Sequence, residues 1–168
     1  GRNMATSLGD VLVTPVDATG WSRKVIGAVT PEFFKIINRG TTQPITISFE
    51  INTPDDPTKT NIFDRIEIDG YSFGYDNVIG NDYFSVFGFK WFEIGNNVWK
   101  GTYSLQFDKG SDVGNSDQPN IDIVQAVKNT TPHNFTVLGN SLCLYWGTQA
   151  IDWTPAPEDV NQQLDKKV

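Results

Sequence analysis

Apolar and polar residues alternate without interruption from residue 45 to residue 52. The apolar positions are Ile45, Ile47, Phe49 and Ile51, and the polar positions between them are Thr46, Ser48, Glu50 and Asn52. Because side chains of a β-strand point alternately to its two sides, this pattern predicts a strand with one buried and one solvated face. No other part of the chain indicates its structure so clearly.

The residues before this strand predict its partner in a hairpin. Phe33 to Ile37 carries apolar side chains on both faces, and Asn38-Arg39-Gly40 has the composition of a turn. We therefore interpret Pro31 to Asn52 as strand, turn and strand. The first of these strands needs cover on both sides, from a second layer of the same chain or from a neighbouring chain.

Further strands are predicted along the rest of the chain. A second long alternation runs from Trp99 to Phe107, after a turn at Glu93 to Asn97 where glycine and asparagine supply the special dihedral angles. A late hairpin is predicted across Gly139-Asn140, between residues 134–138 and 141–146. The count of nine or ten short strands with little helix predicts an all-β antiparallel β-sandwich, of the jelly-roll or immunoglobulin-like type.

The chain of 168 residues is expected to form one domain. We expect residues 1–8 to be a flexible N-terminal arm, residues 9–153 to form the β-sandwich, and residues 154–168 to be a polar C-terminal tail. Met4 is the only methionine, and we favour it as the native first residue over a precursor that was cut before Gly1.

The formal net charge of the chain is −7, and no cluster of Lys or Arg exceeds two residues. Binding to a phosphate backbone needs a concentrated cationic surface, so nucleic acids and anionic membranes are not expected as partners. No apolar run approaches the roughly 20 residues of a membrane span, and the first ten residues lack the apolar segment of a signal peptide. The sequence does not determine the localisation; a virion or an extracellular surface would follow from an assembly role.

Few residues carry reactive chemistry, and none is assigned as catalytic. The single cysteine, Cys143, lies in an apolar run and is expected to be buried and reduced. Glu50 and Glu67 each lie on the polar side of an alternating segment, and two such faces could bring them together as the carboxylate pair of a glycosidase. Glu93 lies next to Trp91 and Phe92, the apolar setting that suits a catalytic acid. The alternative is that all three glutamates lie at the solvated surface of the sheets.

Acidic residues and asparagines are concentrated between residues 108 and 122. Calcium binds oxygen ligands from flexible acidic loops, and the candidate ligands here are Asp108, Asp112, Asp117 and Asp122. Their spacing does not match an EF-hand loop. An exposed polar loop is the simpler interpretation, so we expect no cofactor, with structural calcium as the alternative.

Aromatic residues are mixed with amides and carboxylates in two segments, as they are on sugar-binding surfaces. The residues of these two clusters are Tyr71, Tyr75, Asp76, Asn77, Asn81, Tyr83, Trp146, Gln149, Asp152 and Trp153. Exposed aromatic rings can stack on sugar rings while the polar groups bind hydroxyls. The alternative is that these aromatic side chains fill the core, as Trp99 and Tyr103 are expected to do.

Three functions are consistent with this sequence. The first is a non-enzymatic structural or assembly protein, such as a viral capsid, decoration or protrusion subunit or a filament subunit, which associates with itself or with other structural proteins. In that role Val11-Leu12-Val13 and the N-terminal arm could add to the sheet edge of a neighbour. The second is a carbohydrate-binding module or lectin, and the third is a glycoside-type hydrolase. We rank them in this order and expect the protein not to be an enzyme.

Overall fold

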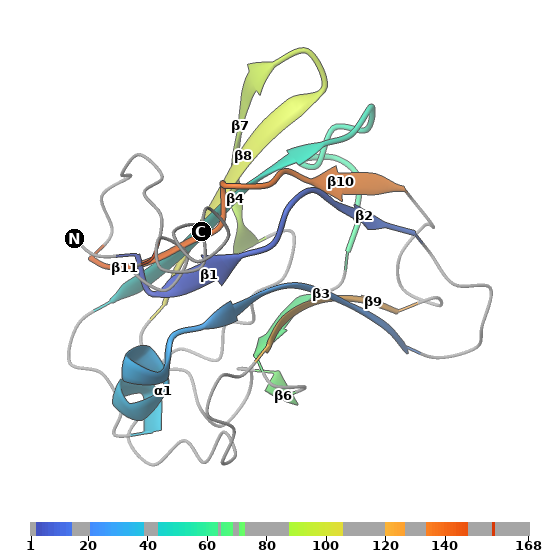
Figure 1. Cartoon of the computed structure of the whole chain (residues 1–168). Helices are drawn as coiled ribbons and strands as arrows, with labels where there is room; N and C mark the ends of the chain where they lie inside the picture. Colours follow the sequence, from blue (N-terminus) through green and yellow to red (C-terminus); the bar gives the residue numbers. More distant parts are fainter. Residues whose placement is uncertain are drawn as a thin grey trace, which may run out of the picture.

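A computed structural model shows two antiparallel β-sheets that form the two layers of a sandwich (Figure 1). The structure describes residues 3–14, 21–38, 44–63, 65–68, 71–72, 88–105, 120–126, 134–147 and 156. The described residues contain eleven strands and one helix. The predicted all-β sandwich is therefore confirmed.

The first sheet has the strand order β1-β3-β9-β5-β6. Its strands are β1 (Ala5–Ser7), β3 (Trp21–Val29), β9 (Asn120–Ala126), β5 (Arg65–Ile68) and β6 (Tyr71–Ser72). The second sheet has the order β2-β10-β4-β8-β7, and β11 also pairs with β4. Its strands are β2 (Val11–Val13), β10 (Phe135–Val137), β4 (Ile45–Asn52), β8 (Val98–Leu105), β7 (Lys90–Gly95) and β11 (Cys143–Trp146). The helix α1 (Pro31–Asn38) connects β3 of the first sheet with β4 of the second.

Strand β4 lies at the centre of the second sheet and follows the alternation in its sequence. Its four apolar side chains are almost fully buried and belong to the core between the sheets. β8 pairs with β4 over its whole length, from Ile45 opposite Leu105 to Asn52 opposite Val98. Both strands predicted from alternation are confirmed, and the polar residues of β4 point away from the core. Thr46 and Ser48 are nevertheless buried, each 1% exposed, so the predicted solvated face is wrong at these two positions.

The hairpin predicted for Pro31 to Asn52 is wrong in its first half, because Pro31–Asn38 forms helix α1. Phe33 is fully buried in the core of its own chain. This side chain therefore does not need a neighbouring chain to cover it.

The physical reason for the helix lies in the residues at its start. The hydroxyl of Thr30 accepts a hydrogen bond from the backbone N–H of Phe33 at 3.4 Å, as an N-cap residue does. Pro31 occupies the first turn, where its missing N–H breaks no helical hydrogen bond. Glu32 lies in the same turn and Lys35 in the last, which places each charge favourably in the helix dipole.

The flexible arm predicted for residues 1–8 is also wrong for the described part of that segment. Strand Ala5–Ser7 pairs with β3 inside the first sheet. The N–H of Met4 donates to the carbonyl of Leu144 at 2.7 Å, and the carbonyl of Met4 accepts from the N–H of Thr30 at 2.9 Å. The segment therefore links β11 of the second sheet to the end of β3. Composition alone could not show these partners, because they are distant in sequence.

The late hairpin predicted across Gly139-Asn140 is wrong in its pairing. Residues 139 and 140 do form a turn, and Asn140 has a φ of 57°. However, β10 and β11 both pair with β4 instead of with each other. The residues between β10 and β11 contact Glu50 of β4. The N–H of Leu138 donates to the carbonyl of Glu50, and the N–H of Glu50 donates to the hydroxyl of Ser141.

The turn predicted at Glu93 to Asn97 is confirmed. It joins β7 and β8, and Asn97 takes the left-handed conformation with a φ of 57°, which asparagine tolerates better than most residues. The carbonyl of Asn97 accepts a hydrogen bond from the N–H of Thr53 at 2.8 Å. Figure 1 shows the β7–β8 hairpin projecting beyond the other strands of the sandwich.

Candidate functional site

The outer face of the second sheet carries the candidate site. Trp91 packs against the core, so its neighbours in β7 point to the opposite face. The register places Lys90 opposite Thr102, and Phe92 opposite Lys100. These four side chains therefore lie next to one another on the outer face of the β7–β8 hairpin.

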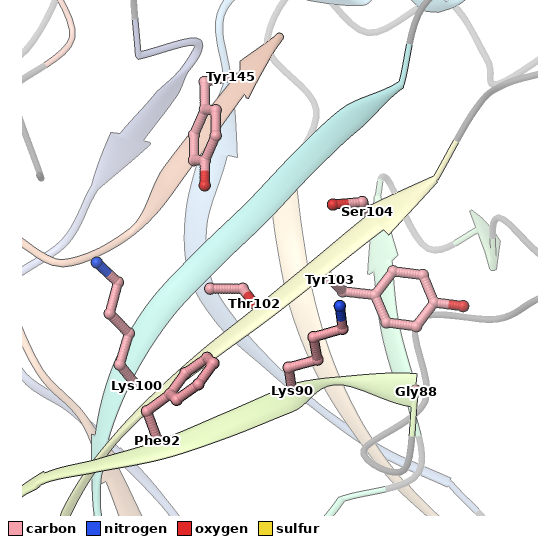
Figure 2. A pocket seen from close by; sticks show the side chains of 8 residues that line it. All are labelled: Gly88, Lys90, Phe92, Lys100, Thr102, Tyr103, Ser104 and Tyr145. Carbon is pink, nitrogen blue, oxygen red and sulfur yellow. The ribbon is translucent and has the colours of Figure 1, made fainter. Parts of the chain in front are cut away.

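They border a pocket with a volume of about 450 Å³ (Figure 2). The described residues that line it are Gly88, Lys90, Phe92, Lys100, Thr102, Tyr103, Ser104 and Tyr145. In Figure 2, Thr102 and Ser104 project from one side of β8 and Tyr103 from the other. A volume of this size falls in the range of roughly 300–1,000 Å³ that is usual for small-ligand sites.

A short chain of hydrogen bonds determines whether Ser104 acts as a donor or as an acceptor toward a ligand in the pocket. The hydroxyl of Thr46 donates its single proton to the carbonyl of Gly147 at 2.6 Å. The hydroxyls of Thr46 and Ser104 are 2.8 Å apart, so Ser104 must donate to Thr46. The oxygen of Ser104 keeps a lone pair for a ligand, and it therefore meets that ligand as a hydrogen-bond acceptor.

Tyr145 brings a third hydroxyl to the site from β11. The β11–β4 register places it opposite Thr46 on the outer face, and its side chain is buried. Figure 2 shows its hydroxyl directed toward Lys100 and Thr102. The phenol is therefore a fixed wall of the pocket, contributed by a strand that is distant in sequence from β7 and β8.

The side chain of Phe92 is 55% exposed, although phenylalanine is one of the most apolar residue types. An exposed aromatic ring beside hydroxyls and ammonium groups offers a flat apolar surface together with polar groups at its edge. Such a set of groups can bind a ligand by stacking, hydrogen bonds and charge.

Most of the aromatic and polar residues predicted as a glycan or partner surface lie outside the described residues. These are Tyr75, Asp76, Asn77, Asn81, Tyr83, Gln149, Asp152 and Trp153. The backbone of Tyr71 pairs with Ile68 in β6 of the first sheet. Trp146 ends β11 and is 36% exposed, so part of its ring is available at the surface. The structure does not bring Trp146 into the pocket.

The glutamates considered as a carboxylate pair do not meet. Phe49 and Ile66 are core residues of the two facing sheets, so Glu50 and Glu67, which follow them, point to opposite outer faces of the sandwich. The possibility that their polar faces form one cleft is therefore excluded. The alternative of a solvated surface is wrong for Glu67, which is 1% exposed. Glu93 is exposed near the end of the β7–β8 hairpin.

Glu67 is instead the centre of an ion-pair cluster on the outer face of the first sheet. Its carboxylate accepts from Arg23 Nε at 2.8 Å and from Arg65 Nη2 at 2.8 Å, and it is 1% exposed. The hydrogen bond to Glu67 is the main cause that raises the pKa of Arg23, with a smaller contribution from Asp122. These contacts give Glu67 a structural role in joining β3 to β5.

The four aspartates considered as calcium ligands can be placed only in part. Asp108, Asp112 and Asp117 lie outside the described residues. Asp122 lies in β9 directly opposite Glu67 and is largely buried. Within the described part of the chain, no group of three or more His, Cys, Asp or Glu side chains is arranged to hold a metal ion. Cys143 is buried, as predicted, and as the single cysteine of the chain it cannot form an intrachain disulfide.

The pocket residues were not recognised in the sequence as a site. The alternation in Trp99 to Phe107 correctly placed Lys100, Thr102 and Ser104 on the solvated side of a strand. The missing information was the register with β7, which adds Lys90 and Phe92 to the same face. The apolar pair Trp91-Phe92 gave the only signal, because two adjacent residues of a strand cannot both face the core.

Comparison of the chain with protein-family models, curated protein sequences and solved structures gave no match in any of the three. In the described part of the chain, no helix is long and apolar enough to cross a membrane.

Proposed function

We propose that the protein is a non-enzymatic carbohydrate-binding module and that its ligand occupies the pocket on the outer face of the second sheet. The observation that carries this proposal is the grouping of one exposed aromatic ring with several hydroxyls around a single pocket. A sugar ring has an apolar face of C–H groups and a rim of hydroxyls. Phe92 matches the face, and Thr102, Ser104 and Tyr145 match the rim.

This proposal reverses the order of functions that the sequence favoured. The assembly role was ranked first partly because of an apolar strand in need of cover and a free N-terminal arm. The first is a helix that buries Phe33, and the second contains a strand paired inside its own sheet. The carbohydrate-binding role does not depend on either feature.

Replacing Phe92 with alanine is expected to weaken the binding of a sugar by about two- to tenfold, because stacking on an aromatic ring contributes roughly 0.5–1.5 kcal/mol. Calorimetric titration with a panel of neutral and acidic oligosaccharides measures this change. Leu12→Ala is the matched control, since Leu12 is 57% exposed on β2 at the opposite edge of the same sheet. The proposal is wrong if no oligosaccharide binds the unmodified protein, or if both variants weaken binding equally.

A second function, assembly through a sheet edge, is favoured by a different observation. β7 is an edge strand of the second sheet, and it exposes both Phe92 and Ile94 on the projecting hairpin. Exposed edge strands with apolar side chains tend to pair with another chain. We propose this role as the alternative, with a second copy of this chain as the partner.

If the assembly proposal is correct, the solution mass should rise above that of a monomer as concentration increases. Replacing Ile94 with lysine should return the protein to a monomer, because a charged residue on an edge strand opposes edge-to-edge pairing. Analytical ultracentrifugation of both proteins measures this. A monomer at every concentration contradicts assembly and leaves the carbohydrate proposal intact.

A further inference from the structure

The hydroxyl of Ser104 belongs to a chain of hydrogen bonds that ends on a backbone carbonyl. The carbonyl of Gly147 accepts from the hydroxyl of Thr46 at 2.6 Å, and that hydroxyl lies 2.8 Å from the hydroxyl of Ser104. A carbonyl has no proton to donate, so the chain runs in one direction only, from Ser104 through Thr46 to Gly147. The donor and acceptor roles of Ser104 are therefore determined outside the pocket.

The backbone at Gly147 holds this carbonyl in place. The N–H of Gly147 donates to the carbonyl of Pro44 at 2.8 Å, directly before the start of β4. Gly147 has a φ of 89°, a conformation that residues with a side chain rarely adopt. The final acceptor of the chain is thus attached to the same strand that carries Thr46.

Thr46 itself lies behind the pocket. It is 1% exposed, and it is not among the described residues that line the pocket. The register of β4 places it between Ser104 of β8 and Tyr145 of β11, which both line the pocket. Because the carbonyl of Gly147 takes its only hydroxyl proton, Thr46 can only accept from Ser104.

Thr102 provides a comparison within the same pocket. It lies two residues from Ser104 on the same face of β8, and it also lines the pocket. In the part of the chain that the structure describes, no hydrogen bond fixes the direction of its hydroxyl. A hydroxyl that can rotate either donates to a ligand or accepts from it, whereas the hydroxyl of Ser104 only accepts. The two hydroxyls therefore impose different requirements on a ligand.

We propose that Thr46 is a positioning residue that makes the pocket select a saccharide with an unsubstituted hydroxyl next to Ser104. That hydroxyl donates its proton to the oxygen of Ser104, whose own proton is held by Thr46. A saccharide with an ether or an ester at this position offers only an acceptor, so two acceptors face each other and no hydrogen bond forms. The inference rests on the proposed carbohydrate-binding function and specifies its class of ligand.

The test uses the methyl glycosides of glucose, galactose and mannose, each together with its monodeoxyfluoro derivatives. Fluorine is close in size to a hydroxyl but carries no proton, so each derivative removes a donor from one position of the sugar. Binding is measured by titration followed by nuclear magnetic resonance, which detects weak affinities. In the unmodified protein, fluorine at the position next to Ser104 should weaken binding by about three- to tenfold, the usual contribution of a neutral hydrogen bond.

Variants assign this discrimination to the chain of hydrogen bonds. Thr46→Val removes the group that holds the proton of Ser104, so Ser104 can donate to fluorine and the loss at that position should fall below about twofold. Thr46→Ser keeps the hydroxyl and should retain the full loss, which a merely structural role of Thr46 would not require. Thr102→Val removes the other hydroxyl of the pocket and should also retain it.

Thermal unfolding verifies that each variant is folded. Ser104→Ala provides a second test at an exposed position, where the substitution should not prevent folding even if Thr46→Val does. Alanine removes the acceptor, so the parent glycoside should bind about three- to tenfold more weakly, and the additional loss caused by fluorine should disappear.

The outcomes separate the two proposals. If a glycoside binds and all its fluoro derivatives bind equally well, the inference about Ser104 is wrong and the carbohydrate-binding function stands. If Thr46→Val or Ser104→Ala retains every loss seen in the unmodified protein, the discrimination comes from other groups and the inference is also wrong. If none of the glycosides binds, both the inference and the proposed function are contradicted.

Discussion

Replacing Phe49 with alanine is expected to lower the free energy of unfolding by about 3–5 kcal/mol, the usual range for removing a buried aromatic side chain. Phe49 is 0% exposed at the centre of β4. Its ring centroid is 5.4 Å from that of Phe89, 6.1 Å from that of Trp91 and 6.4 Å from that of Phe63. The loss combines burial, these ring contacts and the cavity that alanine would leave.

Chemical denaturation followed by tryptophan fluorescence measures the change, because Trp91 belongs to the same cluster. Phe92→Ala is the matched control: the substitution is the same, but the side chain is exposed on the outer face, and the expected loss is below about 1 kcal/mol. Phe49→Leu keeps most of the volume and should cost about 1–2 kcal/mol, which provides a folded variant if alanine prevents folding. Equal losses for Phe49→Ala and Phe92→Ala would contradict the assignment of the two faces of the sheet.

Replacing Asn3 with alanine is expected to cost about 2–4 kcal/mol. The side chain is 1% exposed, and its oxygen accepts from the N–H of Ala5 and from the N–H of Leu144, each at 3.0 Å. Its amide also donates to the carbonyl of Leu142 at 3.0 Å. Alanine removes the partner of two buried N–H groups, and each buried group without a partner costs roughly 1–3 kcal/mol.

The same denaturation experiment tests this prediction against Asn52→Ala, which changes an exposed asparagine of β4 and should alter stability by less than about 0.5 kcal/mol. Hydrogen exchange at Leu144 gives a second readout, since its N–H should lose protection in the Asn3 variant. A loss of stability no greater than that of Asn52→Ala would mean that Asn3 does not connect the sheets, and that the N-terminal segment behaves as the free arm predicted from the sequence.

The hydrogen bonds of Asn3 also affect how the protein could assemble. A segment that is buried and hydrogen-bonded within its own chain cannot add to the sheet of a neighbour without first leaving its place, and leaving exposes the groups that Asn3 satisfies. Among the described residues, β7 with Phe92 and Ile94 is a better surface for self-association than the N-terminal segment, because those side chains are already exposed. The same strand carries two residues of the proposed sugar site, so a ligand and a second copy of the chain would compete for it.

The local pattern of this sequence determined the class of fold and two of its central strands. Strict alternation in residues 45–52 and 99–105 records which side of each strand faces the core, and this information needs only the two-residue period of a strand. Glycine and asparagine in residues 93–97 likewise determined the turn between β7 and β8. Those predictions hold because their causes act between residues that are adjacent in the chain.

One error could have been avoided from the sequence. Thr30-Pro31-Glu32 has the composition of a helix start, and Phe33, Ile36 and Ile37 follow with helical spacing. Short apolar runs fit either a helix or a strand. This run was interpreted as a strand because the clear strand at residues 45–52 follows it closely in the sequence, which favoured a hairpin.

Only the tertiary structure decided where the candidate site lies. Lys90, Phe92, Lys100 and Tyr145 come from three strands, and they share one face because of the register of β7 with β8 and of β11 with β4. That register depends on which residues pack between the two sheets, which is a property of the whole core and not of any one segment. For the same reason Glu50 and Glu67, each on the polar side of its own segment, point to opposite outer faces of the sandwich. Alternation within a strand shows that a side chain faces outward. The pairing of strands that are distant in sequence determines which other side chains lie beside it on that face.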